Sequence, residues 1–176
     1  MRKFGQDPRA FFEMVYRDRA PWDVGKPQSA LVELIEKYPP ADPVLDIGCG
    51  SGDLAIFLAE RGRQVIGVDI VEGAIRQARE KAGDLPKKVR RNLTFREADL
   101  FGPTSPSGPY AAVVDSGFYH LFDEGEVEPF LDRLSELLAP AGRPQPVRRQ
   151  PVYRRARAGG SVVPAAGAGH RARLAR

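Results

Sequence analysis

The stretch VLDIGCGSGD, residues 44–53, decides the fold of this chain. A strand-type run, residues 44–47, leads into a turn with glycines at positions 48, 50 and 52, and a helical pattern begins at Asp53. Glycine allows positive φ at such positions and leaves no side chain to keep a ligand away from the backbone. A strand that passes through such a turn into a helix presents peptide N–H groups to a ligand. The stretch therefore predicts a nucleotide-type pocket at the end of a buried strand.

Strand-type runs and helical patterns alternate along the rest of the chain. Strands are expected at residues 44–47, 64–68, 93–97 and 110–114, and helices at residues 8–17, 28–38, 53–61, 72–82 and 126–138. Such alternation is typical of a parallel sheet with helices packed on its faces. We therefore expect an α/β fold with a Rossmann-like, doubly wound parallel sheet, formed by one domain of residues 1–140.

The overall composition excludes several classes of protein. The 176 residues are 42% hydrophobic and 28% charged, which is close to the average of globular domains and predicts a folded body. Cys49 is the single cysteine, so no disulfide can form within the chain. No apolar run approaches the roughly 18 residues that a membrane-crossing helix needs, and no leader pattern is present. We therefore expect a soluble, cytoplasmic protein without a membrane partner.

The C-terminal tail, residues 141–176, differs in composition from the rest of the chain. It contains nine Arg and no acidic residue, whereas residues 1–140 carry 18 Lys and Arg against 23 Asp and Glu, a net charge of −5. Because Arg, Ala, Pro and Gly dominate the tail, we expect it to be disordered. It is either a basic segment that contacts a polyanion or the product of a frameshift in a GC-rich gene. We favour the frameshift, since Lys, acids and large aliphatic residues disappear together at one point.

A carboxylate follows the glycine turn at an informative distance. Asp69 ends the strand-type run VIGVD, 19 residues after Gly50, which suits an acid that accepts hydrogen bonds from ribose hydroxyls. The dinucleotide fingerprint G-x-G-x-x-G would place its third glycine at position 53, but the third glycine here is Gly52. The pattern D-x-G-x-G-x-G, from Asp46 to Gly52, resembles instead the first motif of class I S-adenosylmethionine (SAM)-dependent methyltransferases.

The resemblance implies SAM as the cofactor and a role for the ends of the first two strands. In this family the glycine turn meets the methionyl part of SAM. Asp69 sits at the position of the ribose-binding acid, with Ile70 beside it against the adenine. Cys49, inside the turn, is most simply a small residue that fills a tight space, because no base is visibly paired with it. The family's reaction requires no metal ion.

Two later segments extend the resemblance to the third and fourth strands. EADLF, residues 97–101, resembles the third-strand motif, in which Asp99 lies near the adenine amino group and Leu100 provides a backbone contact. Asp99 also has an ordinary explanation as the cap of a turn. YAAVVDSG, residues 110–117, corresponds to the fourth strand, which ends with Asp115 beside the reacting methyl group. The cofactor-binding residues implied by the resemblance are Trp22, Asp46, Gly48, Cys49, Gly50, Gly52, Asp69, Ile70, Asp99, Leu100 and Asp115.

Two segments resemble the thiol, halide and thiopurine methyltransferase-like branch of the family. They are APWDVGKPQ, residues 20–28, and DSGFYHLFD, residues 115–123. In that branch the N-terminal segment folds over the SAM pocket, so Trp22 would be a lid residue supported by Asp23. A plain core position for Trp22 is the alternative. The branch implies a small-molecule methyl acceptor, namely a thiol, a halide, a hydroxyl or an N-hydroxyl group.

His120 and Asp115 are the candidate catalytic residues. Methyl transfer is an in-line displacement in which the sulfonium leaves as a neutral thioether, so the protein contributes mainly positioning and deprotonation. His120 is the one histidine of residues 1–140, and it is either a general base for a hydroxyl-type acceptor or a hydrogen-bonded wall of the pocket. Asp115 ends the fourth strand, where ligands of open α/β sheets bind.

The C-terminal tail departs from the family pattern. A complete sheet of this class has the strand order 3-2-1-4-5-7-6, and residues 141–176 show no strand pattern for the last three strands. We therefore expect the C-terminal strands to be missing or replaced, with the fourth strand as an exposed edge. Two other functions stay open: a catalytically inactive SAM-binding remnant or regulator, and a nucleic-acid methyltransferase that uses the basic tail. Nucleic acid is the less favoured partner, and no sequence signal indicates an oligomeric state.

Overall fold

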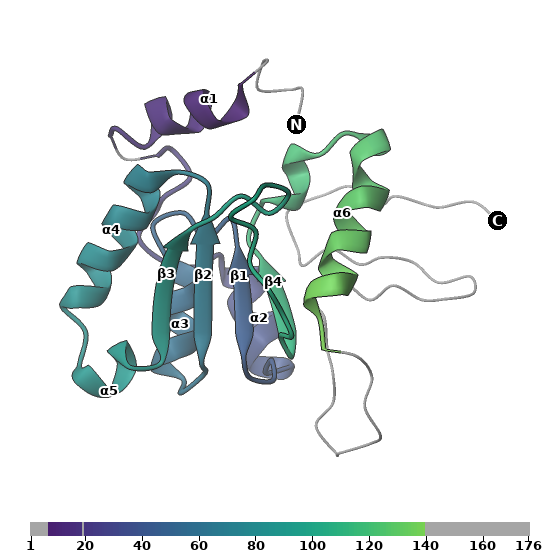
Figure 1. Cartoon of the computed structure of the whole chain (residues 1–176). Coiled ribbons are helices and arrows are strands. Elements are labelled where there is room, and N and C mark those ends of the chain that lie inside the picture. The colour runs from purple at the N-terminus through teal and green to yellow at the C-terminus, as the bar shows by residue number, and fades with distance from the viewer. Residues whose placement is uncertain (1–6, 19, 140–176) are drawn as a thin grey trace.

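The computed structural model describes residues 7–18 and 20–139. Its four strands are all parallel and form one sheet in the order β3-β2-β1-β4 (Figure 1). The strands are β1 (Val44–Ile47), β2 (Val65–Asp69), β3 (Leu93–Glu97) and β4 (Ala112–Asp115). Val44 of β1 lies opposite Val65 of β2 and Ala112 of β4, so the carboxyl ends of the strands meet at one edge. The predicted Rossmann-like parallel sheet is confirmed.

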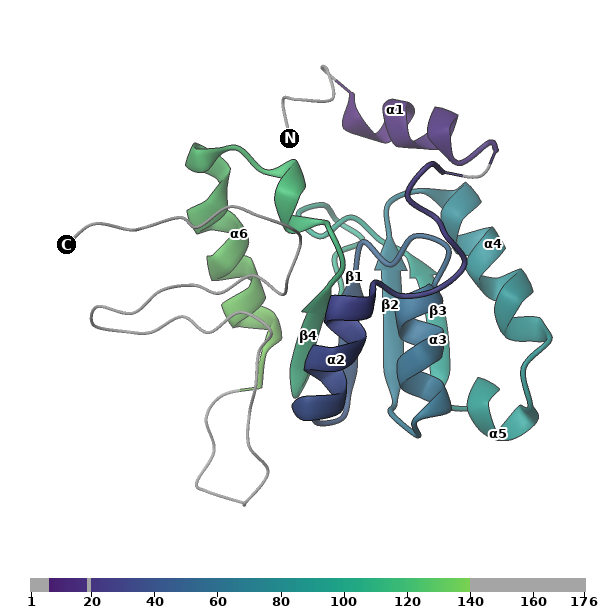
Figure 2. The ribbon, with the colours of Figure 1, turned by 180° about the vertical axis from the view of Figure 1, so that it is seen from behind.

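Helices cover both faces of the sheet and its carboxyl edge. They are α1 (Pro8–Val15), α2 (Ser29–Lys37), α3 (Asp53–Glu60), α4 (Glu72–Gly83), α5 (Lys87–Arg90) and α6 (Glu124–Leu137), with a short 3-10 turn, η2 (Tyr119–Leu121). Figure 2 shows α2 and α3 side by side on one face of the sheet. In both views α1 lies beyond the carboxyl ends of the strands, where it can cover a site at that edge.

Two apolar cores lie on the two faces of the sheet. Successive strand residues point to opposite faces, so β1 contributes to both cores. Val44 packs with residues of α2, α3 and α4 in one cluster. Leu45 and Ile47 pack with Phe130 and its neighbours on α6 in the other cluster. Burial on both faces is the doubly wound arrangement, and it explains why β1, β2 and β4 are mostly apolar, whereas the edge strand β3 is not.

The element boundaries differ from the predicted ones in a few places. β2 extends to Asp69, and β4 begins at Ala112 rather than at Tyr110. α6 begins at Glu124, because the side chains of Asp123 and Glu126 form a capping box around its first turn. The sequence pattern does not predict α5 or η2, since each is too short to show a periodic apolar stripe.

The outer edge of β4 is partly paired. The Tyr110 N–H donates to the Leu137 carbonyl oxygen at 2.8 Å, and the Ala139 N–H donates to the Tyr110 carbonyl oxygen at 2.8 Å. Tyr110 and Leu138 thereby form a parallel bridge. The chain that leaves α6 thus runs beside β4, where a fifth strand would begin. In the described part of the chain no further strand joins this edge, and the C-terminal tail lies outside the described residues.

Arg133 of α6 holds the loop that follows β3. Its guanidinium donates to the carbonyl oxygens of Leu100 at 3.2 Å and Pro106 at 2.9 Å, and to Ser105 Oγ at 2.7 Å. Ser105 Oγ in turn donates to the Leu100 carbonyl oxygen at 2.6 Å. A planar guanidinium satisfies several carbonyl groups of an irregular loop at once. The network therefore sets the position of the loop that contains Asp99.

Candidate functional site

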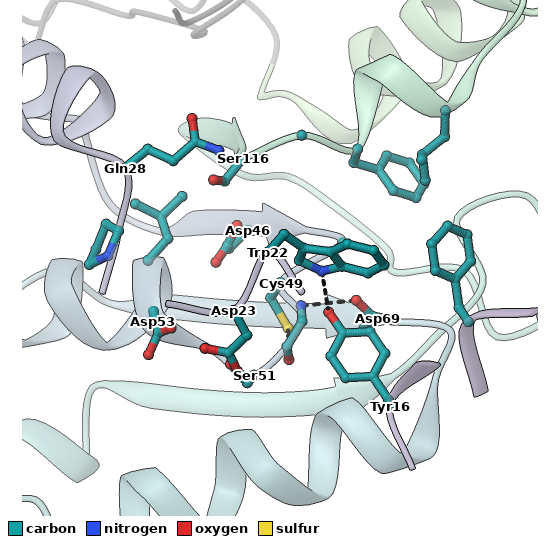
Figure 3. A pocket seen from close by; sticks show the side chains of 18 of the residues that line it. Tyr16, Trp22, Asp23, Gln28, Asp46, Cys49, Ser51, Asp53, Asp69 and Ser116 are labelled. Carbon is teal, nitrogen blue, oxygen red and sulfur yellow. Dashed lines mark hydrogen bonds between the residues drawn. The ribbon is translucent and has the colours of Figure 1, made fainter. Parts of the chain in front are cut away.

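A cavity of about 420 Å³ lies at the carboxyl edge of the sheet. α1 and the connector, residues 20–28, line one side of it, and the glycine turn, residues 48–52, lines the other (Figure 3). This volume falls in the range of roughly 300–1,000 Å³ that is typical of small-molecule sites. Seven of the predicted cofactor-binding residues line the cavity: Trp22, Asp46, Gly48, Cys49, Gly50, Asp69 and Ile70.

The glycine turn needs its glycines for two different reasons. Gly50 has a φ of +54°, and a Cβ on it would lie 2.6 Å from Tyr16 Oη, inside the space that faces the cavity. Gly52 has a φ of +83° and forms the N-cap of α3. A Cβ on Gly52 would lie 2.5 Å from Phe95 Cζ in the core beneath the turn. Gly50 thus leaves room for the Tyr16 hydroxyl against the turn, whereas Gly52 allows the turn to pack on the sheet.

The Asp69 carboxylate connects the ends of β1 and β2. Its Oδ2 accepts a hydrogen bond from the Gly50 N–H at 2.9 Å, and its Oδ1 accepts one from the Val71 N–H at 3.0 Å. Burial raises the pKa of Asp69, and the backbone donors partly offset that rise. Two backbone bonds hold the carboxylate in one orientation at the cavity wall, where its remaining lone pairs can accept hydrogen bonds from a ligand.

Asp46 is a buried carboxylate without a hydrogen-bond partner among the described residues. Its side chain belongs to β1, and the residue is only 1% exposed. Burial raises the pKa of Asp46 well above its usual range, and the negative charges of Asp115 and Asp69 raise it further. A buried, unpaired carboxylate is costly to ionise, so this end of the cavity favours a ligand that brings a positive charge.

Aromatic side chains cover the cavity above the glycine turn. The Trp22 Nε1–H donates to Tyr16 Oη at 3.2 Å (Figure 3). The Trp22 ring also makes edge contacts with the rings of Phe12 and Tyr16, each at 6.1 Å between centroids. Trp22 is 52% exposed, so it covers the cavity and does not occupy the core position considered as the alternative. Burial raises the pKa of Tyr16 well above its usual range, so its hydroxyl keeps its proton.

Tyr16 also lines the cavity, although no sequence motif predicts it as a site residue. Its spacing from Phe12 on α1 indicates only an apolar helix face, and Tyr16 reaches Gly50 because the whole helix folds back over the sheet. The aromatic character of both positions was the available signal. The contact itself joins residues that are far apart in sequence, and no local pattern predicts it.

Five predicted site residues lie outside the cavity lining: Gly52, Asp99, Leu100, Asp115 and His120. Asp99 Oδ1 accepts a hydrogen bond from the Phe101 N–H at 2.9 Å, the turn-cap role given as its alternative. Leu100 is buried, and its carbonyl oxygen already accepts hydrogen bonds from the loop network. Contacts of these two residues with adenine therefore stay predictions.

Neither predicted catalytic residue faces the cavity. The buried Asp115 carboxylate accepts hydrogen bonds from the N–H groups of Phe118 at 2.6 Å and Tyr119 at 2.8 Å. It thereby shapes the turn that places Phe118 in the cavity wall. His120 lies on η2 and is exposed. Asp115 therefore has a structural task in this geometry, and a catalytic role for either residue stays a prediction.

Residues 7–18 and 20–139 contain no group of three or more His, Cys, Asp or Glu side chains that could hold a metal ion. None of the helices in these ranges combines the length and the apolar character that a membrane span requires.

The fold and the site together define a class of protein. The sheet is parallel in the order described, a glycine turn follows β1, and an acid ends β2. These features are typical of the nucleotide-binding α/β folds to which class I methyltransferases belong. The family model described as "Methyltransferase domain" matches residues 44–142. The chain belongs to this family.

Two relatives with curated names are methyltransferases that act on small molecules by those names. The chain is 35% identical over 117 residues to the 2-heptyl-1-hydroxyquinolin-4(1H)-one methyltransferase of Mycobacteroides abscessus. The aligned region covers 62% of this chain and 50% of that protein. The chain is also 30% identical over 123 residues to the probable thiol methyltransferase 2 of Arabidopsis thaliana. The aligned region covers 69% of this chain and 53% of that protein. The chain thus spans about half the length of these curated relatives.

Solved structures show the same fold. One, from work on the conversion of a disulfide bond into a thioacetal group during echinomycin biosynthesis, matches with a TM-score of 0.67 at 33% identity, over 76% of this chain and 57% of that chain. Another is the magnesium protoporphyrin IX methyltransferase of Synechocystis PCC 6803 with bound S-adenosylhomocysteine (SAH). It matches with a TM-score of 0.53 at 29% identity, over 62% of this chain and 49% of that chain.

Proposed function

We propose that this chain binds SAM in the cavity and serves the transfer of its methyl group to a small-molecule acceptor. The observation that carries the proposal is the unpaired Asp46 carboxylate, buried beside a glycine turn that lines the cavity. SAM has both a sulfonium and an ammonium group, so it supplies the positive charge that this end of the cavity lacks. When bound, it offers a methyl group that an acceptor displaces in line.

Different residues of the cavity would contact different parts of SAM. Gly48, Cys49 and Gly50 meet the methionyl part above Asp46, and Asp69 accepts hydrogen bonds from the ribose hydroxyls. Ile70, next to Asp69 in the cavity wall, packs against the adenine. Support comes from Gly52 beneath the turn, from Asp99 and Leu100 in the loop after β3, and from Asp115 behind the wall. We assign all of these to a SAM-binding domain of residues 1–140, with Trp22 as its lid.

The acceptor would lie against the apolar wall of the cavity, to which Val24, Pro27, Phe118 and Leu121 contribute. Such a wall suits a small organic acceptor with an apolar body, and the named relatives act on a hydroxyquinolone and on thiols. We propose a thiol, halide, hydroxyl or N-hydroxyl group as the methylated position. His120 and Asp115 stay the predicted catalytic residues.

Transfer of a labelled methyl group tests this function. The protein is incubated with SAM that has a deuterated methyl group and with a panel of thiols, halides, phenols and N-hydroxy heteroaromatics, and mass spectrometry detects the labelled product. We expect transfer to at least one of these small acceptors. Binding of SAM in calorimetry without any transfer would favour the noncatalytic SAM-binding protein. Transfer to nucleic acid alone, with a rate that declines steeply with salt concentration, would favour a nucleic-acid methyltransferase. Absence of SAM binding would refute all three.

SAM should bind more tightly as the pH rises. Burial raises the pKa values of Asp46 and Asp69 above the value of about 4 that they have in the unfolded chain. In the free protein the protonated carboxyl groups therefore contribute their full stability below about pH 4. This stability is lost as the pH rises through the raised pKa values. Cationic SAM favours the ionised carboxylates and displaces their protons. If one proton is released, the affinity rises by at most about tenfold per pH unit.

Thermal unfolding with and without SAM between about pH 5 and 7 measures this effect. We expect the stabilisation by SAM to grow across the range in the wild type and to depend less on pH in Asp46→Asn. A stabilisation that is the same at every pH in the wild type would contradict the role of Asp46 as the partner of the cofactor's positive charge.

A further inference from the structure

A cluster of charged side chains joins three segments next to the cavity. Lys81, on α4, donates from Nζ to Ser51 Oγ at 2.7 Å and to Asp53 Oδ1 at 2.8 Å. The same Nζ lies 3.6 Å from Asp23 Oδ2 in the connector. Ser51 Oγ donates to Asp23 Oδ2 at 2.6 Å. Lys81 therefore holds the connector and the start of α3 to one point on α4.

Asp23 is the member of this cluster that belongs to the cavity cover. Its side chain is only 7% exposed. Besides Ser51 and Lys81, it binds the backbone of its own segment, since Asp23 Oδ1 accepts a hydrogen bond from the Gly25 N–H at 2.9 Å. A carboxylate this buried stays ionised only if it is paired, so the Lys81 charge stabilises the connector in its place over the glycine turn.

Trp22 connects this cluster to the ligand space. It precedes Asp23 in the connector, and its indole N–H donates to Tyr16 Oη, which stands over Gly50. A cofactor on the glycine turn would lie beneath these two side chains. Lys81 itself does not line the cavity, so it acts on that space through Asp23, Ser51 and Asp53, which do.

We propose that Lys81 is a positioning residue that fastens the connector over the bound cofactor and so slows the release of SAM. The proposal rests on the proposed function, because it takes SAM as the ligand beneath Trp22. Its chemistry is an ion pair between a lysine on a rigid helix and an aspartate in a segment without regular secondary structure. We expect loss of that ion pair to loosen the connector, because the connector has no regular secondary structure of its own.

The single tryptophan of the chain makes the proposal measurable. Because Trp22 is the single tryptophan and lies in the connector, its fluorescence reports on the connector and its immediate surroundings. Stopped-flow mixing with increasing SAM gives the association rate from the slope and the dissociation rate from the intercept. In Lys81→Met we expect SAM to dissociate about tenfold faster, as befits the loss of one charge-assisted contact, with little change in the association rate.

Three further variants separate positioning from general stability. Lys81→Arg keeps the charge and should restore most of the slow release. Asp23→Asn should speed release as Lys81→Met does, and the double variant should release SAM no faster than the single ones, because both changes break one interaction. Lys88→Met, on the exposed side of α5, removes a matched charge and should behave as the wild type.

Acrylamide quenching of Trp22 without SAM examines the connector independently of the cofactor. We expect stronger quenching in Lys81→Met than in the wild type and in Lys88→Met. If Lys81→Met only lowers the melting temperature, with release and quenching as in the wild type, Lys81 is merely a stabilising residue and the proposal is overturned. If quenching rises but the wild type binds no SAM, the proposed function has failed and the fastening of the connector stands.

Discussion

Replacement of Gly50 by Val is expected to abolish SAM binding. Gly50 has a φ of +54°, a region that β-branched residues hardly ever adopt. A Cβ at this position would lie 2.6 Å from Tyr16 Oη, so a valine side chain would force Tyr16 away from the glycine turn and disturb the cover of the cavity. The proposed SAM site needs the glycine turn and this cover in place, and calorimetry should detect no binding to the folded variant.

A second glycine provides the matched control for this experiment. Gly62 also has a positive φ, +82°, but a Cβ on it would have no heavy atom within 4 Å. Gly62→Val therefore carries a similar backbone strain of about 1–2 kcal/mol without blocking any cavity, and it should bind SAM normally. If Gly50→Val folds and binds SAM like Gly62→Val, the cofactor does not lie on the glycine turn.

Replacement of Asp69 by Ala should weaken SAM binding by roughly 10- to 150-fold, equivalent to about 1.5–3 kcal/mol. The carboxylate is held at the cavity wall by the N–H groups of Gly50 and Val71, and its free lone pairs are the proposed acceptors for the ribose hydroxyls. The alanine variant loses these charge-assisted bonds. It also leaves the Gly50 N–H without its acceptor, so some loss of stability should accompany the loss of affinity.

Two companion variants separate those effects in calorimetry and thermal unfolding. Asp69→Asn retains one oxygen that can accept from the Gly50 N–H, so its stability should recover more than its affinity for SAM. Asp84→Ala removes an exposed carboxylate at the end of α4 and should change neither quantity. Normal SAM affinity in a folded Asp69→Ala protein would place the ribose elsewhere.

The part of the fold that depends on local pattern was predictable. Val44–Ile47, the glycine turn and α3 follow one another without a break, and each has its own sequence signal. The relation of Gly50 to Asp69 was also predictable, because a βαβ unit brings consecutive parallel strands side by side. The structure joins these two residues by a hydrogen bond of 2.9 Å.

The roles of individual side chains beyond that unit were less predictable. Asp115 was chosen because it ends a strand beside the site, but its carboxylate is occupied by the N–H groups of Phe118 and Tyr119. His120 was chosen by residue type, and it is exposed on η2. Position along a strand indicates which end of the sheet a residue occupies, whereas the direction of its side chain depends on the backbone donors around it.

By itself, the sequence determined the order of strands and helices, the glycine turn and the acid that follows it. These depend on propensity, periodicity and spacing, which are properties of neighbouring residues. Only the tertiary structure decided that Tyr16 stands over Gly50, that Asp46 is buried without a partner, and that Lys81 holds Asp23. Each of these contacts or burials arises when segments distant in sequence pack together, and packing also sets the desolvation that makes a buried charge matter. VLDIGCGSGD thus predicts where a cofactor lies, and the folded chain decides what covers that place.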